Sequence, residues 1–106
     1  MIVRYGYFDG TIVPGREKAF YAYVTDTMMA VWQAFPGLER LEVLKGHSAE
    51  LDRAYPLITV FAFADRPTLE AALVSPERQR SLEATKGLLE MFDGKIVHVV
   101  TEPLGL

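Results

Sequence analysis

The stretch Leu57-Ile-Thr-Val-Phe-Ala-Phe63 is apolar at six of its seven positions. Strands with one face in water alternate apolar and polar residues, whereas a strand covered on both faces reads as a continuous apolar run. The stretch therefore predicts a central strand of a sheet. Residues 46–56 before it are polar and of mixed charge, and predict the longest loop in the chain. Asp65 and Pro67 after it predict a helix start, because aspartate caps a helix and proline fits its first turn.

Three further strands and two further helical segments follow from the same kind of pattern. An apolar stripe at three- to four-residue spacing predicts a helix between the Pro-Gly pairs at 14–15 and 36–37. Ser75-Pro76 predicts a second helix in the C-terminal half, with Leu82, Leu88, Leu89 and Phe92 on its buried side. The predicted elements are a strand at 2–8, a helix at 16–35, strands at 38–45 and 57–63, helices at 68–74 and 76–92, and a strand at 95–101.

The order of these elements is βαββαβ, in a chain of 106 residues without repeats or linkers. This order folds most economically as a ferredoxin-like sandwich, an α+β fold in which both helices cover one face of a four-stranded antiparallel sheet. The expected lateral order of the strands is four, one, three, two. The length fits one domain, residues 1–106.

Side chains along each strand point alternately to the two faces of the sheet, which divides them into two sets. The first set is uncharged, and we expect the helices to cover it. It consists of Val3, Tyr5, Tyr7, Leu41, Val43, Ile58, Val60, Ala62, Val97 and Val99. The second set is mostly apolar but carries polar groups. It consists of Ile2, Arg4, Phe8, Leu38, Arg40, Glu42, Leu44, Leu57, Thr59, Phe61, Phe63, Ile96, His98 and Val100.

The second set would then have no helix over it. At about 25 cal/mol per Å² of apolar surface, leaving it in water would forgo several kcal/mol. A second copy of the chain, packed sheet against sheet about a two-fold axis, would hide it. We therefore expect a homodimer in which the two sheets form a dimeric α+β barrel lined by the second set.

Composition excludes several classes of function. The formal net charge is −3 and no run of more than two neighbouring cations occurs, so we expect no nucleic-acid partner. Without cysteine the chain has no disulfide, thiolate nucleophile or thiolate metal site. Because no apolar stretch reaches the length of a membrane span and the N-terminus lacks the pattern of a signal peptide, we expect no membrane partner and a cytoplasmic location.

Two segments resemble a known family. Residues 35–40, Phe-Pro-Gly-Leu-Glu-Arg, resemble the PGL element of EthD-type proteins, and residues 63–77 resemble their signature F-D-S-L-E-A-L-x-A-A-L-x-S-P-E. With the terminal strand, the resemblance spans nearly the whole chain. It implies a homodimer of the dimeric α+β barrel superfamily. EthD itself is associated with ether-degradation operons, but the resemblance fixes no reaction. Many members place a histidine in the first helix where this chain has Met28.

The polar members of the second set form the candidate site. His98 and Arg4 fall on adjacent predicted strands, with Thr59 one strand further. A neighbouring cation keeps a histidine neutral, and a neutral imidazole can act as a general base near pH 7. We assign His98 as the base and Arg4 as the anion-stabilising group. The residues expected to bind the ligand are Thr59, Arg40, Glu42, Phe61, Met28 and Trp32. The competing interpretation is that the polar residues only pair across a dimer contact, and that Met28 and Trp32 only pack helix against sheet.

These observations favour an EthD-like protein that binds a small, apolar organic molecule. As an enzyme it would act without a cofactor, by proton transfer or oxygenation, in a catabolic or secondary-metabolic pathway. The alternatives are a non-catalytic accessory or ligand-binding homodimer, and a dimer whose interior its own side chains fill. We expect no metal, because the two histidines are far apart and lack His-x-x-x-His or Glu-x-x-His spacing. Neither a Gly-x-Gly-x-x-Gly nor a Walker-type loop is present to hold a nucleotide.

Overall fold

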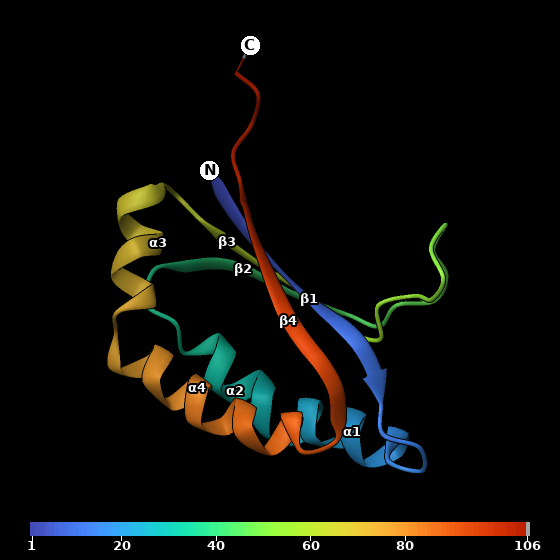
Figure 1. Cartoon of the computed structure of the whole chain (residues 1–106). Coiled ribbons are helices and arrows are strands. Elements are labelled where there is room, and N and C mark those ends of the chain that lie inside the picture. The colour runs from blue at the N-terminus through green and yellow to red at the C-terminus, as the bar shows by residue number, and fades with distance from the viewer. Residues whose placement is uncertain (106) are drawn as a thin grey trace.

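Four antiparallel strands form one sheet, and the helices lie on a single face of it (Figure 1). The computed structural model describes residues 1–105. The strands are β1 (Ile2–Ile12), β2 (Leu38–Leu44), β3 (Ile58–Phe63) and β4 (Phe92–Thr101). Their lateral order is β2-β3-β1-β4. This is the predicted order, and the prediction of a ferredoxin-like fold is confirmed.

Two helical regions connect the strands. The first is one continuous run of α1 (Glu17–Tyr23), a π-helix η1 (Val24–Met28) and α2 (Met29–Gln33). The second consists of α3 (Arg66–Leu73) and α4 (Pro76–Leu89). No helix within residues 1–105 is both long and apolar enough to cross a membrane. Figure 1 shows that α2 and α4 run side by side on this face of the sheet.

The starts of α3 and α4 agree with the capping pattern in the sequence. The Asp65 side chain accepts a hydrogen bond from the Thr68 N–H at 3.0 Å, and the Ser75 hydroxyl accepts one from the Arg78 N–H at 3.2 Å. A proline occupies the first turn of each helix. These caps satisfy N–H groups that have no partner inside a helix. They therefore fix where α4 begins, and with it the position of Arg78.

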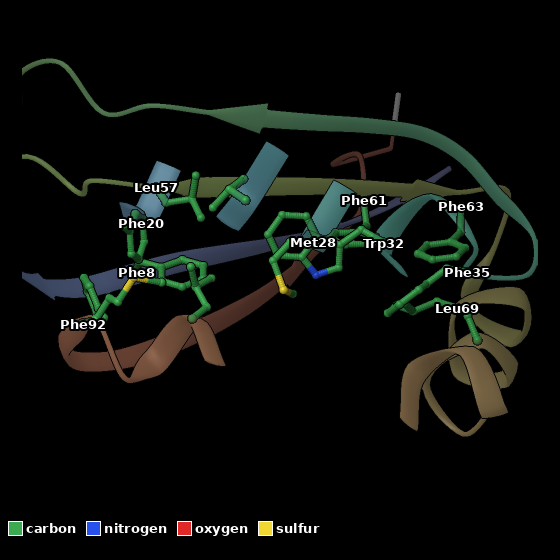
Figure 2. Packing of buried hydrophobic residues seen from close by; sticks show 14 of the residues in the cluster. Phe8, Phe20, Met28, Trp32, Phe35, Leu57, Phe61, Phe63, Leu69 and Phe92 are labelled. Atoms are coloured by element: carbon green, nitrogen blue, oxygen red, sulfur yellow. The ribbon is translucent and has the colours of Figure 1, made fainter. Parts of the chain in front are cut away.

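The core lies between the sheet and the helices and is rich in aromatic rings (Figure 2). At one end Phe8 of β1 and Phe20 of α1 meet edge to face, with ring centroids 6.1 Å apart. In the middle Trp32 of α2 meets Phe61 of β3 edge to face at 6.2 Å. The ring of Phe35 lies 5.0 Å from that of Phe61. The large residues of the second set therefore face the helices.

The prediction that the helices cover the first set is wrong. Phe8 and Phe61, both of the second set, are only 1% and 4% exposed beneath the helices. Interiors pack to crystal-like density, and large aromatic rings fill the space between a sheet and helices better than valines do. The prediction chose the first set as the helix-covered face because that set carries no charge. In the structure, side-chain volume decides which face the helices cover.

A β-bulge in β2 changes which side chains share a face. Between Leu38 and Arg40 the register to β3 shifts by one residue. After the bulge Leu41 packs against the core, while Arg40 and Glu42 lie on the opposite face. There they form an ion pair at 3.3 Å, about half exposed to water. The prediction that Arg40 and Glu42 share the face of His98 is therefore wrong.

The uncovered face of the sheet carries most of the first set. Val97 and Val99 of β4 are 37% and 42% exposed. Tyr5 and Tyr7 of β1 stack there with ring centroids 6.0 Å apart, and Tyr55 from the loop before β3 packs against Tyr7 at 5.1 Å. The chain thus keeps one largely apolar sheet face without a helix, although it is the opposite face to the one expected.

Candidate functional site

A cavity of about 60 Å³ lies between the sheet and helix α4. Three neighbouring strands supply its floor: β1 contributes Arg4 and Phe8, β3 contributes Thr59 and Phe61, and β4 contributes His98. Because β4 is an edge strand, His98 is reached from water on its outer side. The floor therefore combines aromatic rings with one hydroxyl, one guanidinium group and one imidazole.

The helices supply the opposite walls. Trp32 comes from α2, and Arg78, Ser81 and Thr85 come from α4, where their spacing places them on one side of the helix. Ser81 donates its hydroxyl hydrogen to the Arg78 carbonyl at 2.9 Å, and Thr85 donates to the Ser81 carbonyl at 2.7 Å. Because both hydroxyl hydrogens are used within the helix, Arg78 is the main polar donor that this wall offers.

The cavity brings together five of the residues that the sequence predicted for the site: Arg4, Thr59, Phe61, His98 and Trp32. Met28 does not line it, because its side chain is fully buried in the core. Arg40 and Glu42 lie on the other face of the sheet. The regular alternation along β1, β3 and β4 explains why the first group converges, and the bulge in β2 explains why the last two residues do not.

Arg78 is the charged cavity residue that sequence reasoning missed. It lies in the run Glu77-Arg78-Gln79-Arg80, which reads as a solvated helix face. A signal that could have found it is the recurrence of Arg78, Ser81 and Thr85 along one side of the helix, because small hydroxyl residues there let the helix approach the sheet closely. Ser81 is 4% exposed, whereas Leu82 beside it is 43% exposed.

Gly6 keeps the floor of the cavity open. In the middle of β1 it pairs with Thr59 on one side and His98 on the other. A Cβ atom at this position would lie 2.5 Å from the Thr59 Oγ1 and 3.5 Å from the His98 ring. Glycine weakens a strand interior and often marks a place where another group approaches the backbone. The missing side chain therefore leaves room between the two polar groups.

The cavity carries unbalanced positive charge. Two arginines and a histidine line it, and no aspartate or glutamate does. Within residues 1–105 the ion pairs all lie elsewhere, so neither Arg4 nor Arg78 has a carboxylate partner. Burial and the charge of Arg78 lower the pKa of Arg4 to about 10, and burial also lowers the pKa of Arg78. Arg4 is nevertheless charged at pH 7.

The same surroundings keep His98 neutral. Partial burial, followed by the charges of Arg4 and Arg78, lowers its pKa from 6.5 to about 4. A neutral imidazole has a ring nitrogen with a free lone pair, which can accept a proton. Within residues 1–105 no three His, Cys, Asp or Glu side chains gather as metal ligands. His98 therefore has the protonation state that a base requires at neutral pH.

Solved structures resemble this one over nearly its whole length. An EthD family protein from Bacillus halodurans C-125 superposes with a TM-score of 0.74 at 16% identity, over 98% of this chain and 99% of that one. The chain folds as an EthD-type protein does. A DABB family protein with a ferredoxin-like fold from Mesorhizobium loti has a TM-score of 0.66 at 19% identity, over 98% and 97% of the two chains.

A third similar structure is SnoaB, a cofactor-independent oxygenase from Streptomyces nogalater, with a TM-score of 0.63 at 17% identity over 99% of this chain and 94% of that one. No protein-family model and no curated protein matches the sequence. The resemblance to EthD-type proteins in residues 35–40 and 63–77 is thus confirmed at the level of the fold. The chemistry of this chain follows from its own cavity.

The pKa of His98 predicts how the stability of this protein depends on pH. An unfolded chain takes up the His98 proton near pH 6.5, whereas the folded chain takes it up near pH 4. Between these values the unfolded state binds more protons, so the free energy of unfolding falls as the pH is lowered through this window. We expect His98→Gln to reduce that fall, measured by urea denaturation at pH 4.5 and 7.5.

His47→Gln is the matched control for this measurement. His47 is exposed in the loop before β3 and does not line the cavity. If the His98→Gln variant loses stability on acidification as steeply as the His47→Gln variant does, the lowered pKa of His98 is refuted.

Proposed function

We propose that this chain binds a small organic molecule in the cavity between the sheet and α4, and that it removes a proton from that molecule without a bound cofactor. The observation that carries the proposal is a neutral imidazole, His98, beside an arginine that has no carboxylate partner, on the floor of one cavity. A base takes the proton, and a fixed cation stabilises the negative charge that develops on the ligand.

Each side chain has a defined role in this reaction. A ring nitrogen of His98 takes the proton as a C–H bond next to a carbonyl, or the O–H bond of a phenol, breaks. The electron pair stays on the ligand as an enolate or phenolate, and Arg4 stabilises it. The Thr59 hydroxyl can donate a hydrogen bond to the same oxygen. Phe61 and Trp32 hold the apolar part of the ligand and reduce contact with water, which strengthens the charge interactions.

The two reactions expected from the sequence share this first step. In a proton transfer, His98 returns the proton to another atom of the ligand. In an oxygenation, dioxygen as the co-reactant forms a C–O bond with the carbanion, and the resulting peroxide anion takes the proton back from His98 to give a hydroperoxide. The structural likeness to SnoaB, a cofactor-independent oxygenase, supports the second reaction, and the cavity residues support the step that both need.

A second candidate function is ligand binding without catalysis. Burial and two cations account for the low pKa of His98, and no hydrogen bond within residues 1–105 contributes to it. Catalytic bases are commonly oriented by a third group, which fixes the ring. Met28 also stands where many EthD-type proteins have a histidine. An accessory protein of this kind would bind the ligand and leave it unchanged.

The proposal includes a homodimer that forms through the uncovered face of the sheet. Val97, Val99 and the stacked rings of Tyr5 and Tyr7 offer apolar surface there. Covering such surface stabilises an assembly by about 25 cal/mol per Å², and two sheets pack well face to face. The dimer contact and the cavity then lie on opposite faces of the same sheet.

A fluorescence screen tests ligand binding. Trp32 is the single tryptophan of the chain and lines the cavity, so its emission reports occupancy. We expect a library of small carbonyl and aromatic compounds to contain members that quench it. Gly6→Ala should weaken these by at least about ten-fold, because its methyl group takes up the space between Thr59 and His98.

Gly105→Ala is the control for the screen, since a Cβ at Gly105 meets no atom within 4 Å. Circular dichroism establishes that both variants are folded. Compounds that bind the Gly6→Ala variant as tightly as the wild type would place the binding site outside this cavity. A library without any compound that quenches Trp32 would contradict the proposed function itself.

A further inference from the structure

The two guanidinium groups in the cavity lack the counter-charge that such groups normally have. The chain contains 14 Asp and Glu residues, yet none of them lines the cavity. Arg53 and Arg80, by contrast, pair with carboxylates at 2.9 and 3.2 Å. Partly buried charges are costly unless they are paired and hydrogen-bonded. A negatively charged group that does not belong to residues 1–105 would therefore balance the charge of the two arginines.

We propose that Arg4 and Arg78 together bind the carboxylate of the ligand, which makes the ligand a compact organic acid. This inference rests on the proposed function and specifies its class of substrate. Arg4 reaches the cavity from the sheet and Arg78 from α4, so a carboxylate between them can accept hydrogen bonds from both walls. Guanidinium groups match the planar, two-oxygen geometry of a carboxylate.

The rest of the cavity indicates that the anion is organic. The rings of Phe8, Phe35 and Phe61 line it, and they have no hydrogen bond to offer to an inorganic ion. An apolar group on the ligand would gain free energy by leaving water for these rings. The carboxylate then lies at the arginines, and the carbon skeleton points toward the aromatic side.

The volume of the cavity limits the size of that skeleton. It measures about 60 Å³, whereas an engineered apolar cavity of about 150 Å³ accommodates benzene. A branched group of three carbons is thus a suitable size for the apolar part. The mouth lies near Leu82 and His98, which are both exposed, so the carboxylate itself need not enter the apolar end.

A matched pair of probes tests the inference. Sodium isobutyrate and isobutyramide share a carbon skeleton and differ in charge. Trp32 fluorescence and calorimetry measure their affinities for the whole chain at pH 7. We expect isobutyrate to bind at least about ten-fold tighter than isobutyramide, because hydrogen bonds between charged groups are roughly twice as strong as neutral ones. Arg4→Gln and Arg78→Gln should each remove most of that difference.

Arg80→Gln is the matched control. Arg80 lies on the same helix, pairs with Glu77 at 3.2 Å, and does not line the cavity. This variant should keep the wild-type preference for the acid, and circular dichroism establishes that all three variants are folded. If the Arg4→Gln variant does not fold, the Arg78→Gln variant still tests the inference, because Arg78 lies on a helix and not in the sheet.

The other outcomes separate this inference from the proposed function. Equal affinities for isobutyrate and isobutyramide would overturn the role of the two arginines and leave the cavity as a binding site. If inorganic phosphate binds as tightly as isobutyrate, the inference that the ligand is an organic acid is overturned. No binding of any of the three probes would also overturn the inference, and the proposed function would then depend on the neutral compounds in the fluorescence screen.

Discussion

His98→Gln is expected to lower the turnover of a confirmed substrate by at least about a hundred-fold, since general-base catalysis contributes about 10²- to 10⁴-fold. Glutamine retains hydrogen-bonding groups at the cavity floor but cannot take up a proton. The loss should therefore appear in kcat, with a smaller change in KM, because the residues that hold the ligand stay in place. Steady-state kinetics of both proteins measure the two effects separately.

His47→Gln serves here as a control too and should keep wild-type kinetics. The pH profile gives an independent readout. Because the pKa of His98 is about 4, the wild-type protein should show no loss of the proposed activity from protonation of this residue between pH 6 and 8. Turnover unchanged by His98→Gln would remove the assigned base, and binding of a ligand with no turnover by the wild type would establish the accessory function instead.

Glutamates at both Val97 and Val99 are expected to convert the proposed dimer into monomers. Both side chains lie on the uncovered face of the edge strand β4. In a sheet-to-sheet contact the two negative charges would lose water without gaining a partner, which costs several kcal/mol. The dissociation constant should rise by at least about a hundred-fold, which corresponds to about 2.7 kcal/mol. Sedimentation velocity at micromolar concentration measures the change.

Val100→Glu is the matched control for the assembly. Val100 lies on the same strand but points to the face that the helices cover, and it is already exposed at the edge. This variant should sediment as the wild type does. A wild-type chain that sediments as a single subunit at micromolar concentration would refute the dimer. If the Val97→Glu/Val99→Glu variant stays dimeric, the dimer contact lies on another surface.

The order of elements and of strands was predictable because it depends on local patterns. Apolar periodicity separates strands from helices, and Asp65 and Ser75 mark two helix starts by their own hydrogen bonds. The convergence of Arg4, Thr59 and His98 was predictable too. It needs only regular alternation on three neighbouring strands, and their registers are regular.

Features that depend on packing between elements could not be predicted. The choice of face for the helices depends on the volume that the rings of Phe8 and Phe61 fill, which a comparison of charge does not measure. The bulge before Arg40 shows only as a three-residue step from Leu38 to Leu41, which is too short a pattern to establish a bulge without the register to β3. The rotation of α4 depends on close approach to the sheet. This rotation buries Ser81 and leaves Leu82 largely exposed, although the sequence pattern predicted Leu82 on the buried side. The same rotation brings Arg78 into the site.

The π-helix η1 determines where Trp32 lies. Phe20, Val24, Met28 and Trp32 are all buried, and they follow one another at intervals of four residues. In an unbroken α-helix each residue advances the helix by about 100°, so three such intervals would leave Trp32 about 120° away from Phe20 around the axis. The wider turn of η1 absorbs one residue and cancels most of that drift. After deletion of one residue from 24–28, a regular α-helix would place Trp32 eleven positions from Phe20 and about 20° away around the axis, so the indole would stay on the buried side. The π-helix therefore accommodates one extra residue without turning the aromatic wall away from the sheet.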